Sequence, residues 1–182
     1  MDDKTLIKEI QNGKKEYLND IAERYYDDIY RFCCYQSGSA LDAYDLAQET
    51  FLKFIRYIDG YRYKNLKGYL LTIAMNVCRD YYHKPEKKYA VDIAAPDMDK
   101  ISGLKKETPQ GERNIESRIL LTEALDRIAP EQREAIVLLY AYGYKYREIA
   151  KMTGTNLSTV KSRVYQGTEK LRRMIHREDF YG

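Results

Sequence analysis

Apolar residues recur every three or four positions along most of this 182-residue chain, and that periodicity restricts it to helices. Before residue 84 the apolar stripes consist of Leu18, Ile21, Tyr25, Ile29 and Phe32, then Leu46, Phe51, Phe54, Ile55 and Ile58, then Leu70, Ile73, Ala74, Val77 and Tyr81. The last stripe predicts a helix from about Tyr69 to His83. Strand patterns, repeats and glycine-rich phosphate loops are absent from the sequence, so we predict an all-α fold.

The composition changes abruptly between the two halves of the chain. Residues 84–114 hold three of the four prolines and mix seven cations with six acids, without helical periodicity. Such a segment buries too little apolar surface to offset its conformational entropy. We therefore expect two small helical domains, at residues 1–84 and 115–182, joined by a flexible linker at residues 85–114.

A second feature is the spacing of small, turn-forming and apolar residues within "YREIAKMTGTNLSTVKSRVYQGTEKLRRMI" (146–175). Ala150 permits close approach of two helices, and Gly154 tolerates the left-handed backbone of a tight turn. Asn156 is a strong N-cap for the next helix, and Val160 can pack back on the first. This spacing is that of a DNA-binding helix-turn-helix.

Positive charge follows that motif. Between residues 151 and 177 stand seven Lys and Arg residues against the single acid Glu169. The exposed face of the second helix is expected to begin with Ser158, Thr159, Lys161 and Ser162, where it would enter a major groove. An ordinary helical hairpin with a basic surface is the alternative for this segment.

The N-terminal half offers a different combination in "DGYRYKNLKG" (59–68), which we interpret as a loop. Tyr61 and Tyr63 alternate there with Arg62, Lys64 and Lys67. Aromatic rings stack on unpaired bases and cations follow the phosphate backbone, so this composition is the one expected for single-stranded DNA.

Two longer stretches resemble a known family. The N-terminal stretch resembles region 2 of the bacterial extracytoplasmic-function (ECF) sigma factors; it consists of "DAYDLAQETFLKFI" and "YLLTIAMNVCRDYYHK". The C-terminal stretch resembles region 4 of the same family; it reads "LDRIAPEQREAIVLLYAYGYKYREIAKMTGTNLSTVKSRVYQGTEKL". The matches cover roughly residues 15–84 and 115–175, in the family's order. The implied fold is a region 2 helical bundle and a region 4 four-helix domain that contains the helix-turn-helix.

The resemblance also implies site residues. For binding the polymerase core they are Asp45, Gln48, Glu49, Phe51 and Leu52. For the −10 promoter element they are Tyr61, Arg62, Tyr63, Lys64, Lys67, Tyr69, Asn76 and Arg79. For the −35 element they are Ser158, Thr159, Lys161, Ser162, Arg163, Gln166, Lys170 and Arg173. Of the last set, Lys161 suits guanine acceptors and Gln166 suits a bidentate contact to adenine.

The sequence departs from the family pattern at two places. Tyr69 stands where the family usually has a tryptophan. Tyr165, Gln166, Gly167 and Thr168 replace an arginine-rich run. Gly167 inside a helix costs about 1 kcal/mol relative to alanine.

The implied protein is a sigma factor whose partners are the RNA polymerase core, promoter DNA and an anti-sigma factor, which in the family is often membrane-anchored. No small-molecule substrate and no cofactor are expected. No run approaches the ~18 apolar residues of a membrane span, and "MDDKTLIKEIQNGKK" lacks the apolar stretch of a signal peptide, so we expect a cytoplasmic protein. A conventional dimeric helix-turn-helix regulator is the alternative.

An enzyme is disfavoured, and we expect no catalytic or metal-binding residues. His83 and His176 fall in different expected domains among Lys and Arg. The cysteines Cys33, Cys34 and Cys78 lack C-x-x-C spacing, so we expect them to be ordinary buried residues.

Overall fold

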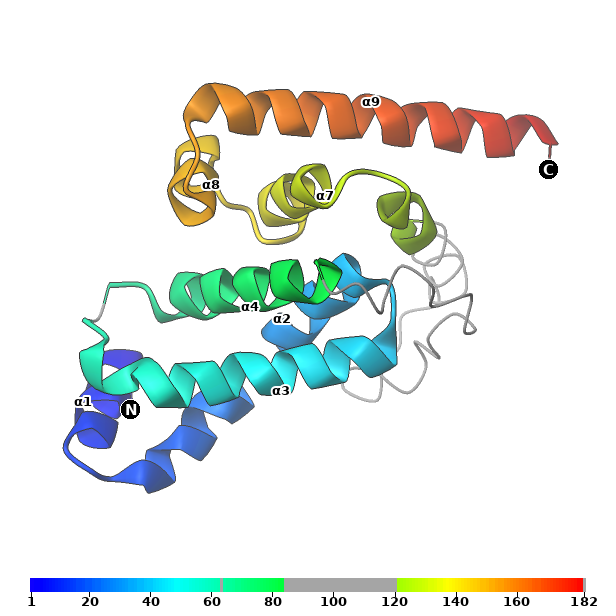
Figure 1. Ribbon diagram of the computed structural model, residues 1–182. Coiled ribbons are helices and arrows are strands. Elements are labelled where there is room, and N and C mark those ends of the chain that lie inside the picture. Colours follow the sequence, from blue (N-terminus) through cyan, green and yellow to red (C-terminus); the bar gives the residue numbers. More distant parts are fainter. Residues whose placement is uncertain (63, 84–120, 182) are drawn as a thin grey trace. The chain divides into compact units, whose positions relative to one another are not determined.

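The computed structural model describes residues 1–62, 64–83 and 121–181, with side chains as far as His176. Within these ranges every regular element is a helix, which confirms the all-α class (Figure 1). Contacts divide the chain into two compact units, built chiefly from the helices up to Tyr82 and from those after Pro130. The expected linker, residues 85–114, lies outside the described residues, as does Ile115, where the second domain was expected to begin.

The N-terminal unit contains α1 (Asp3–Gln11), most of α2 (Leu18–Ser37) and of α3 (Ala40–Tyr57), and α4 (Leu66–Tyr82); residues 34–41, where α2 ends and α3 begins, belong to the other unit. Short 3-10 turns, η1 (Lys15–Tyr17) and η2 (Ile58–Gly60), precede α2 and follow α3. Helix α1 begins where Asp2 accepts a hydrogen bond from the Thr5 amide at 2.8 Å. It buries Leu6, Ile7 and Ile10, so the N-terminal segment is part of the core, which the sequence interpretation did not anticipate.

The core of this unit is made largely of the expected stripes. Ile21, Ile29, Phe32, Leu46, Phe54, Ile58, Leu70, Ala74 and Val77 are all buried. The cysteines are buried and free, and the Sγ atoms of Cys33 and Cys78 lie 4.0 Å apart. The expectation that the cysteines are ordinary buried residues is confirmed.

Two expectations for this unit are wrong. Ile55 is 38% exposed, because α3 turns it away from the buried side that carries Leu46 and Phe54. Helix α4 begins at Leu66 rather than Tyr69, since Asn65 accepts a hydrogen bond from the Gly68 amide at 3.1 Å and caps the first turn. The loop before α4 is correspondingly shorter than the expected 59–68.

The C-terminal unit starts, in the described range, with a helical segment at residues 121–126. It continues with α7 (Pro130–Ile136), the π-helical turn η4 (Val137–Ala141), α8 (Tyr146–Thr153) and α9 (Leu157–Tyr181). Pro130 occupies the first turn of α7, where its missing N–H costs nothing.

The buried Arg133 ties α7 to the segment before it. Its Nε donates to the Leu125 carbonyl oxygen at 2.8 Å, and a terminal nitrogen donates to the Ile128 carbonyl oxygen at 3.3 Å. The guanidinium thus supplies side-chain donors to carbonyls at and after the end of the preceding helical segment. This bracing sets the position of α7, the helix against which α9 packs.

Candidate nucleic-acid and protein interfaces

The turn between α8 and α9 has the geometry that its sequence predicts. Gly154 adopts φ +66° and ψ 30°, a left-handed conformation that favours glycine, and the Thr155 amide donates to the Ala150 carbonyl oxygen at 2.9 Å. Ala150 and Val160 are buried on either side of this turn. The two helices are therefore held as a helix-turn-helix.

Asn156 caps the second helix of the motif. Its Oδ1 accepts a hydrogen bond from the Thr159 amide at 2.8 Å, which satisfies a backbone donor at the start of α9. The beginning of α9 is thus a well-formed helical turn that presents Ser158 and Thr159.

The long helix α9 carries a buried stripe on one side and polar residues outside that stripe. Val160, Val164, Gly167 and Leu171 are buried, at helical spacing. The residues expected at the −35 element lie outside that stripe: Ser158, Lys161, Ser162, Gln166, Lys170 and Arg173 are exposed, and Thr159 and Arg163 are half-buried. Lys161 and Arg163 are two positions apart, so they lie on opposite flanks of the helix, about 160° from one another.

Gly167 lies where α9 packs against α7. A Cβ atom at this position would lie 2.6 Å from Cδ1 of Ile136 and 3.1 Å from Cβ of Gln132. A side chain at this position would force Ile136 and Gln132 to shift, which gives a packing reason for a glycine inside this helix.

Gln132 of α7 forms hydrogen bonds with two side chains of α9. Its Nε2 donates to Oε1 of Gln166 at 3.3 Å, and its Oε1 accepts from Nζ of Lys170 at 3.4 Å. Gln132 is 8% exposed and is not among the residues expected from the sequence. Its hydrogen bonds depend on the crossing of α7 and α9. In the sequence, the one signal of that crossing is Gly167, a glycine inside a predicted helix.

In the N-terminal unit, an aromatic surface lies where the loop enters α4. The rings of Tyr61 and Tyr69 are stacked with centroids 4.4 Å apart, and Tyr69 meets Phe54 edge-on at 6.3 Å. Partial burial, with a smaller contribution from Tyr57, raises the pKa of the Tyr69 hydroxyl. Tyr63 lies outside the described residues.

Helix α1 supports this loop from its C-terminal end. Nε2 of Gln11 donates to the carbonyl oxygens of Ile58 and Tyr61, both at 2.8 Å. One side chain therefore fastens both ends of the turn that leads to Tyr61. Gln11 is not among the residues expected from the sequence.

The cations near this surface differ in their surroundings. Arg62 and Lys64 are exposed. Lys67 lies in the first turn of α4, and its Nζ pairs with Oδ2 of Asp28 at 2.9 Å. Asn76 is exposed and Arg79 half-buried. Since Tyr69 and Asn76 are seven residues apart, they lie on the same face of α4, about 10 Å from one another along the axis.

The outer face of α3 carries the residues expected to bind the polymerase core. Asp45, Gln48 and Leu52 are exposed at helical spacing, and Glu49 is exposed beside them. The fifth residue, Phe51, is half-buried and stacks on Tyr26 with centroids 6.1 Å apart.

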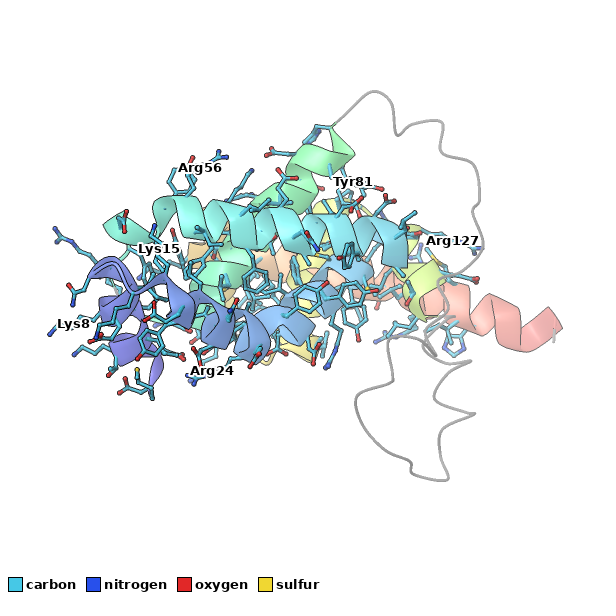
Figure 2. All side chains as sticks on the ribbon, turned by 90° about the horizontal axis from the view of Figure 1, so that it is seen from below. Lys8, Lys15, Arg24, Arg56, Tyr81 and Arg127 are labelled. Atoms are coloured by element: carbon cyan, nitrogen blue, oxygen red, sulfur yellow. The ribbon has the colours of Figure 1, made fainter. Side chains whose placement is uncertain are left out.

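Apolar side chains extend this face of α3. Leu41 is 73% exposed and Leu52 62% exposed, and Ile55 joins them. Arg56 projects away from the helix into solvent (Figure 2). An exposed face that mixes Leu and Ile with Asp and Glu is suited to binding another protein.

The described residues show no group of three His, Cys, Asp or Glu side chains that could hold a metal ion. Among the described helices, none is both long and apolar enough to cross a membrane.

Comparison with family models places two regions on this chain. The model for Sigma-70 region 2 matches residues 21–88, and the model for Sigma-70, region 4 matches residues 118–171. Helix α1, with Gln11, precedes the first match.

Curated relatives match over most of the chain. It is 33% identical to the ECF RNA polymerase sigma factor EcfG of Rhodopseudomonas palustris over 148 residues, which cover 79% of this chain and 78% of that protein. It is 31% identical to SigE of Mycolicibacterium smegmatis, covering 85% of this chain and 60% of SigE. It is 25% identical to BldN of Streptomyces coelicolor, covering 93% of this chain and 64% of BldN. The chain therefore spans less than two thirds of the length of SigE and BldN.

Solved structures share the fold. CnrH, in complex with the cytosolic domain of CnrY, superposes with a TM-score of 0.69 at 18% identity, covering 96% of this chain and 97% of that one. The sigma factor RpoE, in complex with the anti-sigma factor NepR from Bartonella quintana, superposes with a TM-score of 0.65 at 24% identity, covering 87% of this chain and 96% of RpoE.

Proposed function

This chain belongs to the extracytoplasmic-function (ECF) RNA polymerase sigma factors, and from that membership we propose that it is a dissociable specificity subunit of RNA polymerase. It directs the polymerase core to particular promoters, and the core performs all the chemistry. The observation that carries the proposal is the presence, in one chain, of the stacked Tyr61–Tyr69 surface and a capped helix-turn-helix. The first is suited to unpaired bases and the second to duplex DNA.

The −10 element binds along the loop and α4. Bases of the opened strand stack on Tyr61 and Tyr69, and Asn76, exposed on the same face of α4 as Tyr69, forms hydrogen bonds with the edge of an extruded base. Cations close to that face contact the phosphates; they are Arg62, Lys64, Lys67 and Arg79, with Tyr63 as a further aromatic residue.

The −35 element binds at the N-terminal half of α9. Ser158, Thr159 and Ser162 enter the major groove, with Lys161 on one flank and Arg163 on the other. Gln166 completes the base-reading set, and Lys170 and Arg173 contact phosphates farther along the helix.

The outer face of α3 binds the polymerase core. Asp45, Gln48 and Glu49 supply polar contacts, and Leu52 supplies an exposed apolar anchor. Phe51 acts from beneath by packing the helix on Tyr26.

An anti-sigma factor holds the protein inactive by covering these surfaces, and the protein acts in the cytoplasm, where the polymerase is. Support comes from two structural neighbours: RpoE was solved in complex with the anti-sigma factor NepR, and CnrH in complex with the cytosolic domain of CnrY.

Transcription in vitro from genomic fragments, with core polymerase and with or without this chain, tests the proposal. Specific new transcripts that disappear with Lys161→Ala or Asn76→Ala are the expected result. If the chain yields no transcripts, fails to bind the core and occupies duplex sites tightly by itself, it is a conventional regulator instead.

A further inference from the structure

The chain of hydrogen bonds from Lys170 through Gln132 to Gln166 has a direction. The Lys170 ammonium can only donate, so the atom of Gln132 that faces it at 3.4 Å must be the acceptor Oε1. The Gln132 amide is then oriented with Nε2 toward Gln166, and Nε2 can only donate. The Gln166 atom that receives this hydrogen bond at 3.3 Å is therefore Oε1.

The orientation of the exposed Gln166 amide follows from that sequence of bonds. With Oε1 turned back toward α7, the Nε2 group is the end directed away from α7 and outward from α9. A free glutamine presents either end of its amide with equal ease, whereas this one presents a donor.

Three features of the structure hold Gln132 in place for this task. It is nearly buried at the crossing of α7 and α9, and the absent side chain of Gly167 lets the helices approach closely enough for its amide to reach Gln166. The adjacent Arg133 fixes α7 through its hydrogen bonds to the Leu125 and Ile128 carbonyls.

We propose that Gln132 is a positioning residue for −35 recognition, which makes Gln166 read one base through its Nε2 donor alone. This inference rests on the proposed function, because it requires α9 to read promoter DNA. In the major groove the hydrogen-bonding groups of guanine (O6 and N7) and thymine (O4) are all acceptors, whereas that of cytosine (the N4 amino group) is a donor. Gln166 therefore favours guanine or thymine over cytosine, rather than the bidentate adenine contact expected from the sequence.

A glutamate at position 132 makes the proposal sharply testable. Its carboxylate can only accept, so in Gln132→Glu it takes a hydrogen bond from Nε2 of Gln166 and turns Oε1 outward. Oε1 accepts from cytosine N4 or adenine N6, so the base preference reverses. Lys170 remains beside the new carboxylate and compensates its charge.

The experiment is transcription in vitro by the holoenzyme from a promoter library with a randomised −35 element, followed by sequencing of the transcripts. Wild type is expected to favour guanine or thymine over cytosine at one position by about 2- to 10-fold, the value of one hydrogen bond. Gln132→Glu moves that position toward cytosine or adenine. Gln132→Met, whose side chain cannot orient the Gln166 amide by a hydrogen bond, removes the base preference at that position. This variant replaces Gln132→Glu in the test if the glutamate variant folds poorly.

Two controls separate positioning from a general loss of structure. Glu131→Gln changes the charge of an exposed neighbour on α7 and leaves every base preference unchanged. In a Gln166→Ala background, Gln132→Glu has no further effect on base preference, because the amide on which it acts is gone.

The outcomes distinguish this inference from the function on which it rests. If Gln166→Ala abolishes a preference that Gln132→Glu and Gln132→Met both leave intact, the positioning role is wrong and the sigma-factor function stands. If Gln166→Ala changes no preference, the inference is also overturned. If wild type directs no specific transcription at all, the proposed function itself fails.

Discussion

Tyr61 lies against Tyr69 with ring centroids 4.4 Å apart and planes inclined by 29°, so the loop after η2 and the first turns of α4 share one aromatic surface. Phe54 meets the second ring edge-on and supports it from α3. Tyr69, which stands where the family usually has a tryptophan, is thus backed by a second tyrosine ring. An aromatic surface beside exposed cations is what holds unpaired bases out of a duplex.

Tyr69→Ala is expected to weaken promoter opening. Loss of one stacked base costs about 1–3 kcal/mol, or roughly 5- to 150-fold in the stability of the open complex. Permanganate reactivity of unpaired thymines, measured with core polymerase present, reports the change. Tyr69→Trp retains or improves opening, whereas Tyr140→Ala, which removes another exposed tyrosine, leaves it unchanged. Equal opening by wild type and Tyr69→Ala would rule out a stacking role.

Gln11→Ala is expected to loosen the loop that carries Tyr61, because two hydrogen bonds of 2.8 Å are lost. Local opening of residues 58–62 becomes easier by about 1–2 kcal/mol. Amide hydrogen exchange measures this, and the exchange of α4 stays unchanged. Lys8→Ala is the matched control, since Lys8 lies on the same helix and points into solvent (Figure 2). Faster exchange in both variants would mean that α1 merely stabilises the unit.

Leu52→Glu is expected to reduce binding to the polymerase core by at least about fivefold, because it removes an exposed apolar anchor from α3. The stability of the chain should be unchanged, since the side chain is 62% exposed. Titration of labelled protein with core polymerase measures the affinity. Ile175→Glu makes the same change at another exposed apolar position and should have no effect. Unaltered binding by Leu52→Glu would remove this face of α3 from the interface.

The roles of residues in turns and helix caps could be predicted from the sequence, whereas contacts between segments distant in the sequence could not. Gly154 and Asn156 act through their own backbone turn, so their roles follow from residue type and spacing. Ile55 was assigned to the core because it is apolar, yet on α3 it belongs to the exposed side, and periodicity alone does not separate a core stripe from a partner-binding one. Gln132 bonds across the crossing of α7 and α9, and Gln11 reaches from α1 to the η2 turn and the loop after it; only the folded chain brings these segments together.

The N-cap of α9 gives a direct stability prediction. Asn156→Ala removes the acceptor of the Thr159 amide and should cost about 1 kcal/mol of the free energy of unfolding of the C-terminal unit. Asn156→Asp keeps the acceptor and should cost much less. Urea titration followed by circular dichroism compares the two variants. A loss of the same size in both would mean that the side-chain hydrogen bond contributes nothing.

Gly167→Ala places two opposing effects in competition. Alanine gains about 1 kcal/mol of helix propensity. Its Cβ atom, however, would lie 2.6 Å from Cδ1 of Ile136 and 3.1 Å from Cβ of Gln132, and the second contact gives way only if α7 moves. Overpacking of this kind costs about 1–3 kcal/mol, so we expect a net loss of about 1 kcal/mol.

Ile136→Val tests the cause, because it removes the Cδ1 atom that lies nearest to the added methyl group. Alone it should cost about 0.5–1.5 kcal/mol, and combined with Gly167→Ala it should cost less than the sum of the two single changes. Thr168→Ala, at the neighbouring half-buried position, is the control for helix propensity and should stabilise slightly. Thermal unfolding of the four variants measures the coupling. A gain in stability for Gly167→Ala alone would mean that α7 and α9 have room at their crossing, and that glycine is not required there for packing.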